Sequence, residues 1–388
     1  MISGVYKFAK LSLACVCGLL LSGCEMDTTG LGGPGINPNK PVEVALLVPS
    51  GSSDAGVNAL ANSLIRSAQM AVEENAQTPI DLKIYSTAGN PEQAANAAKQ
   101  AVKDGAKIII GPLYSESSNA VSVAVANSGV NVLSFSNNAS VAGGRLFVMG
   151  NTYRNIADRL VGYASARGLV RIASVAPRNA AGNDAATEVS RAAARYGAQF
   201  TGSSSYDFNL NSIVQSAPII SQEVQAAGAN AIVLTADSAG ALPLLAQMLP
   251  ENGLNPSEVK YMGLARWDIP PETLVQNGLQ GGWFAVPDFN AAESFRARYV
   301  SKYGSDPHPL AGLAFDGIKT VSQMVQTGAA NALTGQALVA APGFYGASGF
   351  FRFMPDGTVQ RALAVAEVDN GTYRIIDPAP RTFAGAGF

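Results

Sequence analysis

The sequence predicts an α/β protein with two Rossmann-like lobes, each built around a parallel sheet. Short apolar runs alternate with segments of helical periodicity, a pattern typical of parallel strands that helices cover on both faces. The alternation restarts after Asn151, which indicates a second lobe. The chain has 388 residues, which is long enough for two domains of ordinary size.

The chain begins with residues typical of an export signal. A basic start precedes an apolar run from Leu11 to Leu21, which is too short for a permanent membrane helix. The run ends in Leu-Ser-Gly-Cys, which resembles the bacterial lipobox, where the chain is cut before a lipidated cysteine. We therefore expect residues 1–23 to be removed and Cys24 to anchor the protein in the periplasm, at the inner or the outer membrane. The alternative is an ordinary signal peptide with an incidental cysteine.

The composition argues against several classes of function. Charged residues make up 14% of the chain, the net charge is −2 and no basic block occurs, so we expect no nucleic-acid partner. Cys15 and Cys17 lie in the segment that is removed, so Cys24 is the one remaining cysteine and no disulfide is expected. His308 is the single histidine. Without a catalytic constellation or metal-ligand spacing in the sequence, we expect a protein with no cofactor, no metal and no enzymatic activity.

The first predicted lobe follows a predicted tether. Residues 24–40 are rich in Gly, Pro and Asn and lack periodicity, as flexible linkers do. Beyond them, apolar runs predict strands and helical spacing of apolar residues predicts helices. Asn90 and Pro91 are typical of a helix start, and Gly105 is typical of a helix end. The expected strands are 42–48, 80–85, 107–111 and 130–135, and the expected helices are 59–75, 91–104 and 115–127.

The second half repeats the alternation and ends in hairpins. The Asp356-Gly357 and Asn370-Gly371 pairs predict tight turns between short antiparallel strands. We expect residues 378–388 to form a disordered tail. The expected helices are 156–167, 184–196, 213–227, 239–249, 293–303 and 309–326, and the expected strands are 171–176, 200–206, 231–235, 260–264, 282–286, 349–353, 361–368 and 373–376.

Four segments resemble the type I periplasmic solute-binding proteins, in particular the group that binds leucine and other branched-chain amino acids. Residues 68–74 (AQMAVEE) match the first helix, and residues 108–118 (IIIGPLYSESS) match the strand, turn and helix that open the ligand site in that family. Residues 130–136 (VNVLSFS) match the next strand and its polar turn. Residues 349–353 (GFFRF) resemble the last crossing between the lobes. Because the segments keep the family's order along nearly the whole mature chain, they imply its two-lobed fold.

The resemblance also implies how the chain divides between the lobes. It implies three hinge crossings, near residues 150–152, 285–288 and 347–351. The first lobe is then expected to hold residues 41–150 and 288–346, and the second residues 151–287 and 347–377. Closure about these hinges would enclose a ligand between the lobes.

Polar side chains at the ends of two predicted strands are candidate ligand contacts. The helix start after Gly111-Pro112 offers free N–H groups and hydroxyls, which suit a carboxylate or another anion. The alternative is plain N-capping by serine. Two carboxylates are candidates for the acidic residue that meets the ligand ammonium in relatives. The candidate residues are Tyr114, Ser115, Ser117, Ser118, Ser136, Asn137, Asp237 and Asp316.

Two functions follow from the resemblance. The first is a lipid-anchored protein that captures a small polar, amino acid-like ligand and delivers it to an ABC-type permease. Residues 178–182 (RNAAG) lack the aromatic residue that amino acid binders carry there, and residues 264–266 (LAR) hold a base where relatives hold an acid. These departures admit the alternative of a penicillin-binding protein activator, whose partner is a peptidoglycan synthase. Residues 45–51 (ALLVPSG) are similar to the start of the leucine-binding-like domain of such activators.

Overall fold

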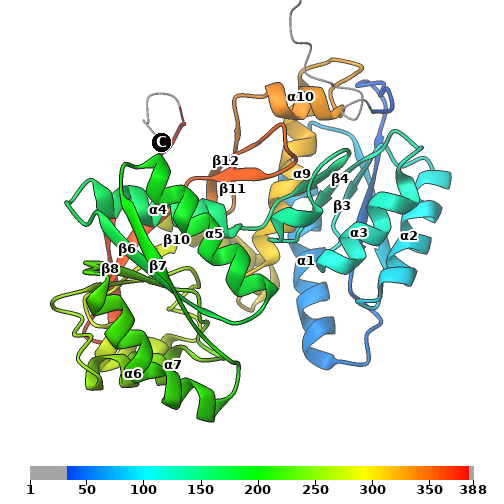
Figure 1. Cartoon of the computed structure of the whole chain (residues 1–388). Helices are drawn as coiled ribbons and strands as arrows, with labels where there is room; N and C mark the ends of the chain where they lie inside the picture. Colours follow the sequence, from blue (N-terminus) through cyan, green and yellow to red (C-terminus); the bar gives the residue numbers. More distant parts are fainter. Residues whose placement is uncertain (1–32, 384–388) are drawn as a thin grey trace, which may run out of the picture.

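The computed structural model describes residues 33–383, so the predicted signal peptide and Cys24 lie outside the described residues. Two α/β lobes stand side by side, each with its own sheet (Figure 1). A small third sheet lies between them at one end of the molecule. The architecture confirms the predicted fold class of two lobes with parallel sheets.

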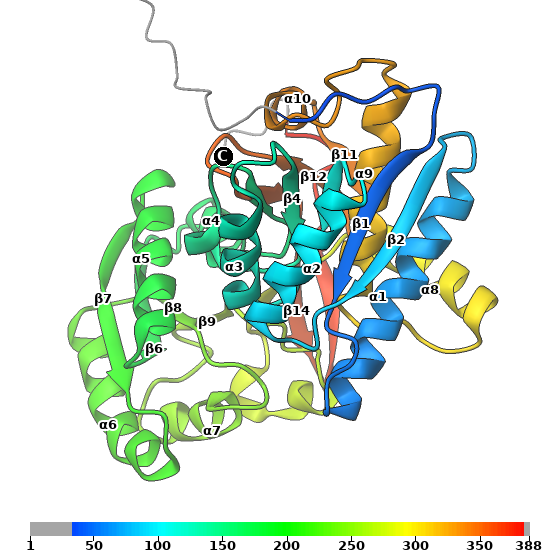
Figure 2. The same ribbon diagram turned by 90° about the vertical axis from the view of Figure 1, so that its right-hand side faces the viewer.

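The first lobe is a parallel sheet between two helical layers. Its strand order is β2, β1, β3, β4, β5. Side chains such as Leu46 and Ile110 pack towards α1 and α9, whereas Leu47 and Ile109 pack towards α2 and α3. Figure 2 shows these two helical layers on either side of the sheet. The elements are β1 (Val42–Val48), α1 (Ala55–Glu74), β2 (Ile80–Ser86), α2 (Pro91–Lys103), β3 (Ile108–Ile110), α3 (Ser115–Val125), β4 (Asn131–Ser134), a 3-10 turn (Ala139–Val141), β5 (Leu146–Val148), α8 (Phe289–Tyr303), α9 (Ala311–Gln326) and α10 (Gly335–Ala340).

The second lobe has a larger, mixed sheet. Five parallel strands in the order β7, β6, β8, β9, β10 continue into the antiparallel pair β14 and β15. The core on one face includes residues of α4 and α5, and the core on the other face includes residues of α6 and α7. The elements are α4 (Tyr153–Ser165), β6 (Arg171–Pro177), α5 (Ala180–Arg195), β7 (Gln199–Tyr206), α6 (Leu210–Ala226), β8 (Ala231–Leu234), α7 (Leu242–Glu251), β9 (Lys260–Gly263), 3-10 turns (Pro271–Val275 and Asn277–Leu279), β10 (Trp283–Val286), β14 (Ala364–Asp369) and β15 (Thr372–Asp377).

The third sheet joins the two cores. Its strands are β11 (Phe344–Gly346), β12 (Gly349–Phe353) and β13 (Val359–Arg361). The side chains of Phe351 and Val359 belong to the core of the first lobe, and that of Ala362 belongs to the core of the second. Phe350 also packs against the core of the second lobe, so this sheet contacts both cores. The crossing expected near residues 347–351 stays a prediction. The other lobe boundaries stay predictions.

Both segments that we expected to be flexible are packed where the structure describes them. In the expected tether, Ile36 is buried and its N–H donates a hydrogen bond to the Ala330 carbonyl at 2.8 Å. In the expected tail, the ring centroid of Phe383 lies 5.1 Å from that of Phe350. Ala379 in the expected tail is also buried in the core of the second lobe. Among the described helices, none combines the length and the apolar character needed to span a membrane.

Two buried tyrosines predict how stability depends on alkaline pH. Burial raises the pKa of Tyr206 to about 12, and it also raises the pKa of Tyr261. Above pH 10 the unfolded chain loses phenolic protons that the native protein keeps. The free energy of unfolding is therefore expected to fall by about 1.4 kcal/mol per pH unit for each tyrosine as the pH rises from 10 towards 12.

Tyr206→Phe and Tyr261→Phe form a matched pair for this prediction. The Tyr261 hydroxyl donates to the Leu254 carbonyl at 2.6 Å, whereas the Tyr206 hydroxyl has no partner among the described residues. Urea unfolding at pH 7 should therefore show a loss of about 1–2 kcal/mol for Tyr261→Phe and little change for Tyr206→Phe. Both variants should unfold with a shallower alkaline slope. A slope equal to that of the unaltered protein in both would contradict the prediction.

Candidate functional site

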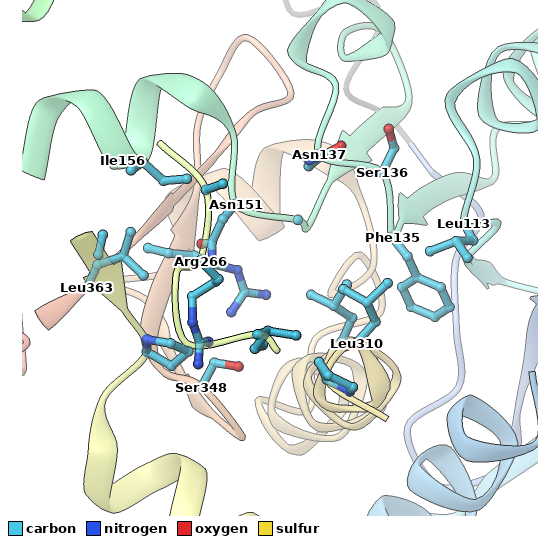
Figure 3. Close-up of a pocket in the computed structure, with 18 of the residues that line it drawn as sticks. Leu113, Phe135, Ser136, Asn137, Asn151, Ile156, Arg266, Leu310, Ser348 and Leu363 are labelled. Atoms are coloured by element: carbon cyan, nitrogen blue, oxygen red, sulfur yellow. The ribbon is translucent and has the colours of Figure 1, made fainter. Parts of the chain in front are cut away.

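A cavity of about 600 Å³ lies where the two lobes face each other. Its walls come from the carboxyl ends of strands in both sheets, which is where open α/β sheets bind ligands. Figure 3 shows Leu113, Phe135 and Leu310 on one side, Ile156 and Leu363 on the other, and Arg266 between them. A volume of this size is typical of sites for small organic ligands.

The turn after β3 brings polar groups to the cavity. Gly111 has φ +86°, and a Cβ atom at this position would lie 2.2 Å from the Leu47 carbonyl oxygen, so the turn requires glycine. The Gly111 N–H donates to the Leu133 carbonyl at 2.8 Å, and the Phe135 N–H donates to the Pro112 carbonyl at 2.9 Å. These bonds tie the turn to β4. Helix α3 therefore starts at the cavity wall.

The structure separates the four candidates at the start of α3. Tyr114 and Ser115 line the cavity. Ser118 is buried behind the wall, where its Oγ donates to the Tyr114 carbonyl at 2.8 Å and lies 2.7 Å from the Ser134 Oγ. Ser117 is also buried and lines a separate depression instead. Among the described residues no side chain caps α3, so the serines do not serve as its N-cap.

Two more candidates lie at the end of β4, on the same wall. Ser136 and Asn137 both line the cavity. The Ser136 hydroxyl is nearly buried and accepts a hydrogen bond from the Asn138 N–H at 3.1 Å. Asn137 is exposed, so its amide is available to a ligand. Asp237, at the end of β8, is exposed but is not part of the cavity lining.

Asp316 has a different role from the one that the sequence suggested. Its side chain is fully buried, and its Oδ2 lies 2.9 Å from the Arg361 Nη1 while its Oδ1 accepts from the Ala347 N–H at 2.6 Å. Burial raises the pKa of the Asp316 carboxyl, and the Arg361 guanidinium acts in the opposite direction. With both oxygens occupied, Asp316 is not available to the ammonium of a ligand.

Sequence reasoning missed two arginines in the cavity wall, Arg361 and Arg266. The Arg266 guanidinium is held by Asp268, with its Nε 2.6 Å from Oδ1. The sequence shows a base at 264–266 where relatives hold an acid, but it suggests no role for Arg266. The sequence signal for Arg361 is a charged residue at the start of the expected strand 361–368, whereas in the structure it is the last residue of β13. Its partner Asp316 is distant along the chain, so the pair leaves no local pattern.

The described residues contain no cluster of three or more His, Cys, Asp or Glu side chains that could hold a metal ion. Within the cavity wall the polar groups are hydroxyls, amides and guanidinium groups. Such groups donate hydrogen bonds and orient a bound solute. The arrangement is suited to holding the polar groups of a small solute.

Three solved structures share the fold over nearly their whole length. A Rhodospirillum rubrum protein described as a branched-chain amino acid ABC transporter is 17% identical with a TM-score of 0.73, over 87% of this chain and 100% of that chain. A Desulfitobacterium hafniense substrate-binding protein in complex with Leu is 16% identical with a TM-score of 0.65, over 87% and 100%. A Rhodopseudomonas palustris solute-binding protein in complex with 3,4-dihydroxybenzoic acid is 17% identical with a TM-score of 0.59, over 88% and 98%. At this identity the likeness shows a common fold.

The chain also matches one curated protein sequence over part of its length and one family model over most of its length. An uncharacterised protein of Rickettsia prowazekii, RP748, is 28% identical over 152 residues, which are 39% of this chain and 40% of that protein. The match thus spans about two fifths of that relative's length. A model described as periplasmic binding protein matches residues 41–372, which include both lobes and the cavity wall. The chain belongs to the periplasmic binding protein family.

Proposed function

We propose that this chain is a lipid-anchored, non-enzymatic solute-binding protein of the periplasm that serves an ABC-type importer. It takes up a small, carboxylate-bearing solute of the amino acid-like kind in the cavity between the lobes and hands it to the permease. One observation carries the proposal. The carboxyl ends of two sheets face each other across a ligand-sized cavity whose walls combine apolar side chains with hydrogen-bond donors.

Lobe 1 supplies the docking surface for the solute in this proposal. Ser115 and Asn137 offer a hydroxyl and an amide, and the first N–H groups of α3 add a partial positive charge. Lobe 2 supplies Arg266 and the apolar side chains Leu264 and Leu363. Rotation of the lobes about the crossings then brings the second wall onto the bound solute. Nothing in the described residues favours the peptidoglycan-synthase partner over the permease.

A thermal-shift screen of the mature protein tests the proposal. Any solute that binds the native state raises the free energy of unfolding, by about 2.7 kcal/mol when its concentration is a hundred times its Kd. The melting temperature therefore rises. We expect a shift of several degrees for one or more amino acids or related carboxylic acids. If no member of a broad set of amino acids, organic acids and sugars changes the melting temperature, the proposal is wrong.

Ser115→Ala is expected to weaken solute binding about tenfold, because one hydrogen bond to the solute is lost. Ser122→Ala is the matched control, since Ser122 lies on the same helix and outside the cavity wall. Calorimetric titration of both variants with the solute from the screen measures the difference. Equal affinities in the two variants would remove Ser115 from the site.

A further inference from the structure

The guanidinium of Arg361 is fixed in the hinge by three interactions. Its Nε donates to the Met149 carbonyl at 2.6 Å, and its Nη1 lies 2.9 Å from the Asp316 carboxylate. Its Cζ lies 4.6 Å from the ring centroid of Phe351. Only 7% of the residue is exposed. The group is therefore held in one position before any ligand arrives, which reduces the entropy lost on binding.

The remaining nitrogen of Arg361, Nη2, is buried and has no hydrogen-bond partner among residues 33–383. A buried donor of a charged group without a partner is costly, and native proteins rarely leave one unsatisfied. Arg361 borders the interlobe cavity and also a void of about 30 Å³ on another side, which has room for little more than a water molecule. Of these two spaces beside Arg361, the interlobe cavity alone has room for a ligand-sized acceptor.

The charged side chains of the cavity wall are basic. Arg361 and Arg266 both contribute to the wall, and no Asp or Glu is found among its described lining residues. An ammonium group in this cavity would have no carboxylate to pair with, and burying it unpaired is unfavourable. Acidic side chains do occur in the neighbouring depression beyond Asn137, where Asp184 and Glu188 lie. A zwitterion that spans both depressions is thus the competing ligand.

The rest of the wall is largely apolar. Large hydrophobic side chains from both lobes enclose the cavity: Leu60, Leu113, Phe135, Ile156, Leu310 and Leu363. Such a wall favours a branched aliphatic or aromatic body by burial of apolar area. A ligand that matches both the basic and the apolar parts of this wall has one anionic end and one apolar end, as a monocarboxylic acid does.

We propose that the cavity takes apolar monocarboxylic acids that have no amino group, and that the free Nη2 of Arg361 binds their carboxylate. The inference rests on the proposed function and narrows its ligand class. Arg361 forms hydrogen bonds with Met149, which follows β5, and with Asp316 of α9. A carboxylate bound to Nη2 would therefore contact a residue that connects β13 to both of these segments at the hinge. Binding at this atom would couple the solute directly to the hinge.

Two pairs of probes that differ in the α-amino group alone test the ligand class. The mature protein is titrated calorimetrically with 4-methylpentanoate against L-leucine and with 3-phenylpropanoate against L-phenylalanine. We expect each acid to bind at least tenfold more tightly than its amino acid. Tighter binding of the amino acids would overturn this inference and leave the proposed function standing. Failure of every solute in the wider screen would instead overturn the proposed function itself.

Two sets of variants test the role assigned to Arg361. Arg361→Gln should weaken binding of the acids at least tenfold, and Arg352→Gln, on the same small sheet but outside the cavity wall, should not. Because Arg361→Gln also disturbs the hinge, Ala265→Glu provides an independent measurement, with Ala265→Gln as the uncharged control. A new carboxylate on the wall should weaken acid binding at least tenfold relative to the control. Unchanged acid binding in both Arg361→Gln and Ala265→Glu would overturn the assignment.

Discussion

Asp316→Asn is expected to lower the free energy of unfolding by about 3–5 kcal/mol, because it leaves the buried Arg361 guanidinium without its counter-charge. Because asparagine has nearly the same shape as aspartate, the substitution creates no cavity. The loss of stability can therefore be attributed to removal of the negative charge. Asp316 and the Arg361 side chain are almost completely buried, and the Nη1–Oδ2 distance is 2.9 Å. Denaturant unfolding followed by circular dichroism measures the change.

An exposed ion pair serves as the control for this prediction. Arg296 contacts Glu293 and Asp306 on the surface of lobe 1, and Arg296→Gln should leave the unfolding midpoint unchanged. The double variant Asp316→Asn, Arg361→Met should recover part of the lost stability, since it removes the unpaired charge. A loss below about 1 kcal/mol for Asp316→Asn would show that the carboxyl is already neutral in the native protein.

Gly111→Ala is expected to cost about 2–5 kcal/mol and to abolish solute binding. The added Cβ atom would lie 2.2 Å from the Leu47 carbonyl oxygen, and φ at this position is +86°. The turn can accept alanine only by moving, and the turn leads directly into Tyr114 and Ser115 on the cavity wall. Stability and ligand affinity should therefore fall together.

Gly105→Ala separates backbone strain from the close contact. Gly105 has φ +96°, but the nearest atom to an added Cβ is the Glu43 Cδ at 3.9 Å, and the residue is remote from the cavity. We expect a loss of about 1–2 kcal/mol from strain alone, with solute affinity unchanged. If Gly111→Ala lost no more stability than Gly105→Ala, the contact with Leu47 would not matter.

Much of the fold could be predicted because its signals are local. The apolar run at 42–48 and the Asn90-Pro91 helix start produce β1 and α2 at the expected places. The Asn370-Gly371 turn also joins two antiparallel strands as expected, with positive φ at both residues. Short elements such as α10 and β11 were missed, because they carry too few residues to show a period.

The site could be predicted in part. Ser115 and Asn137 follow strand ends and lie on the cavity wall, as their positions in the chain suggested. Ser118 follows Ser115 by nearly one helical turn, yet its side chain is buried and forms hydrogen bonds with the Tyr114 carbonyl and the Ser134 hydroxyl. The helical period of the sequence does not predict this difference between the two serines. The Asp316–Arg361 pair depends on long-range contacts between α9 and the third sheet. The sequence suggested that Asp316 would meet a ligand ammonium, because a partner 45 residues away along the chain leaves no local pattern.

Closure of the lobes around a solute is the central claim, and an interlobe distance tests it most directly. In the mature chain with Cys24→Ser, donor and acceptor dyes are attached at Lys99→Cys in α2 of lobe 1 and Glu251→Cys in α7 of lobe 2, both exposed positions. The protein is titrated with 4-methylpentanoate and with L-leucine, and calorimetry establishes occupancy. We predict that energy transfer rises in step with occupancy as the lobes approach each other. An energy transfer that stays constant while the cavity fills would contradict the account.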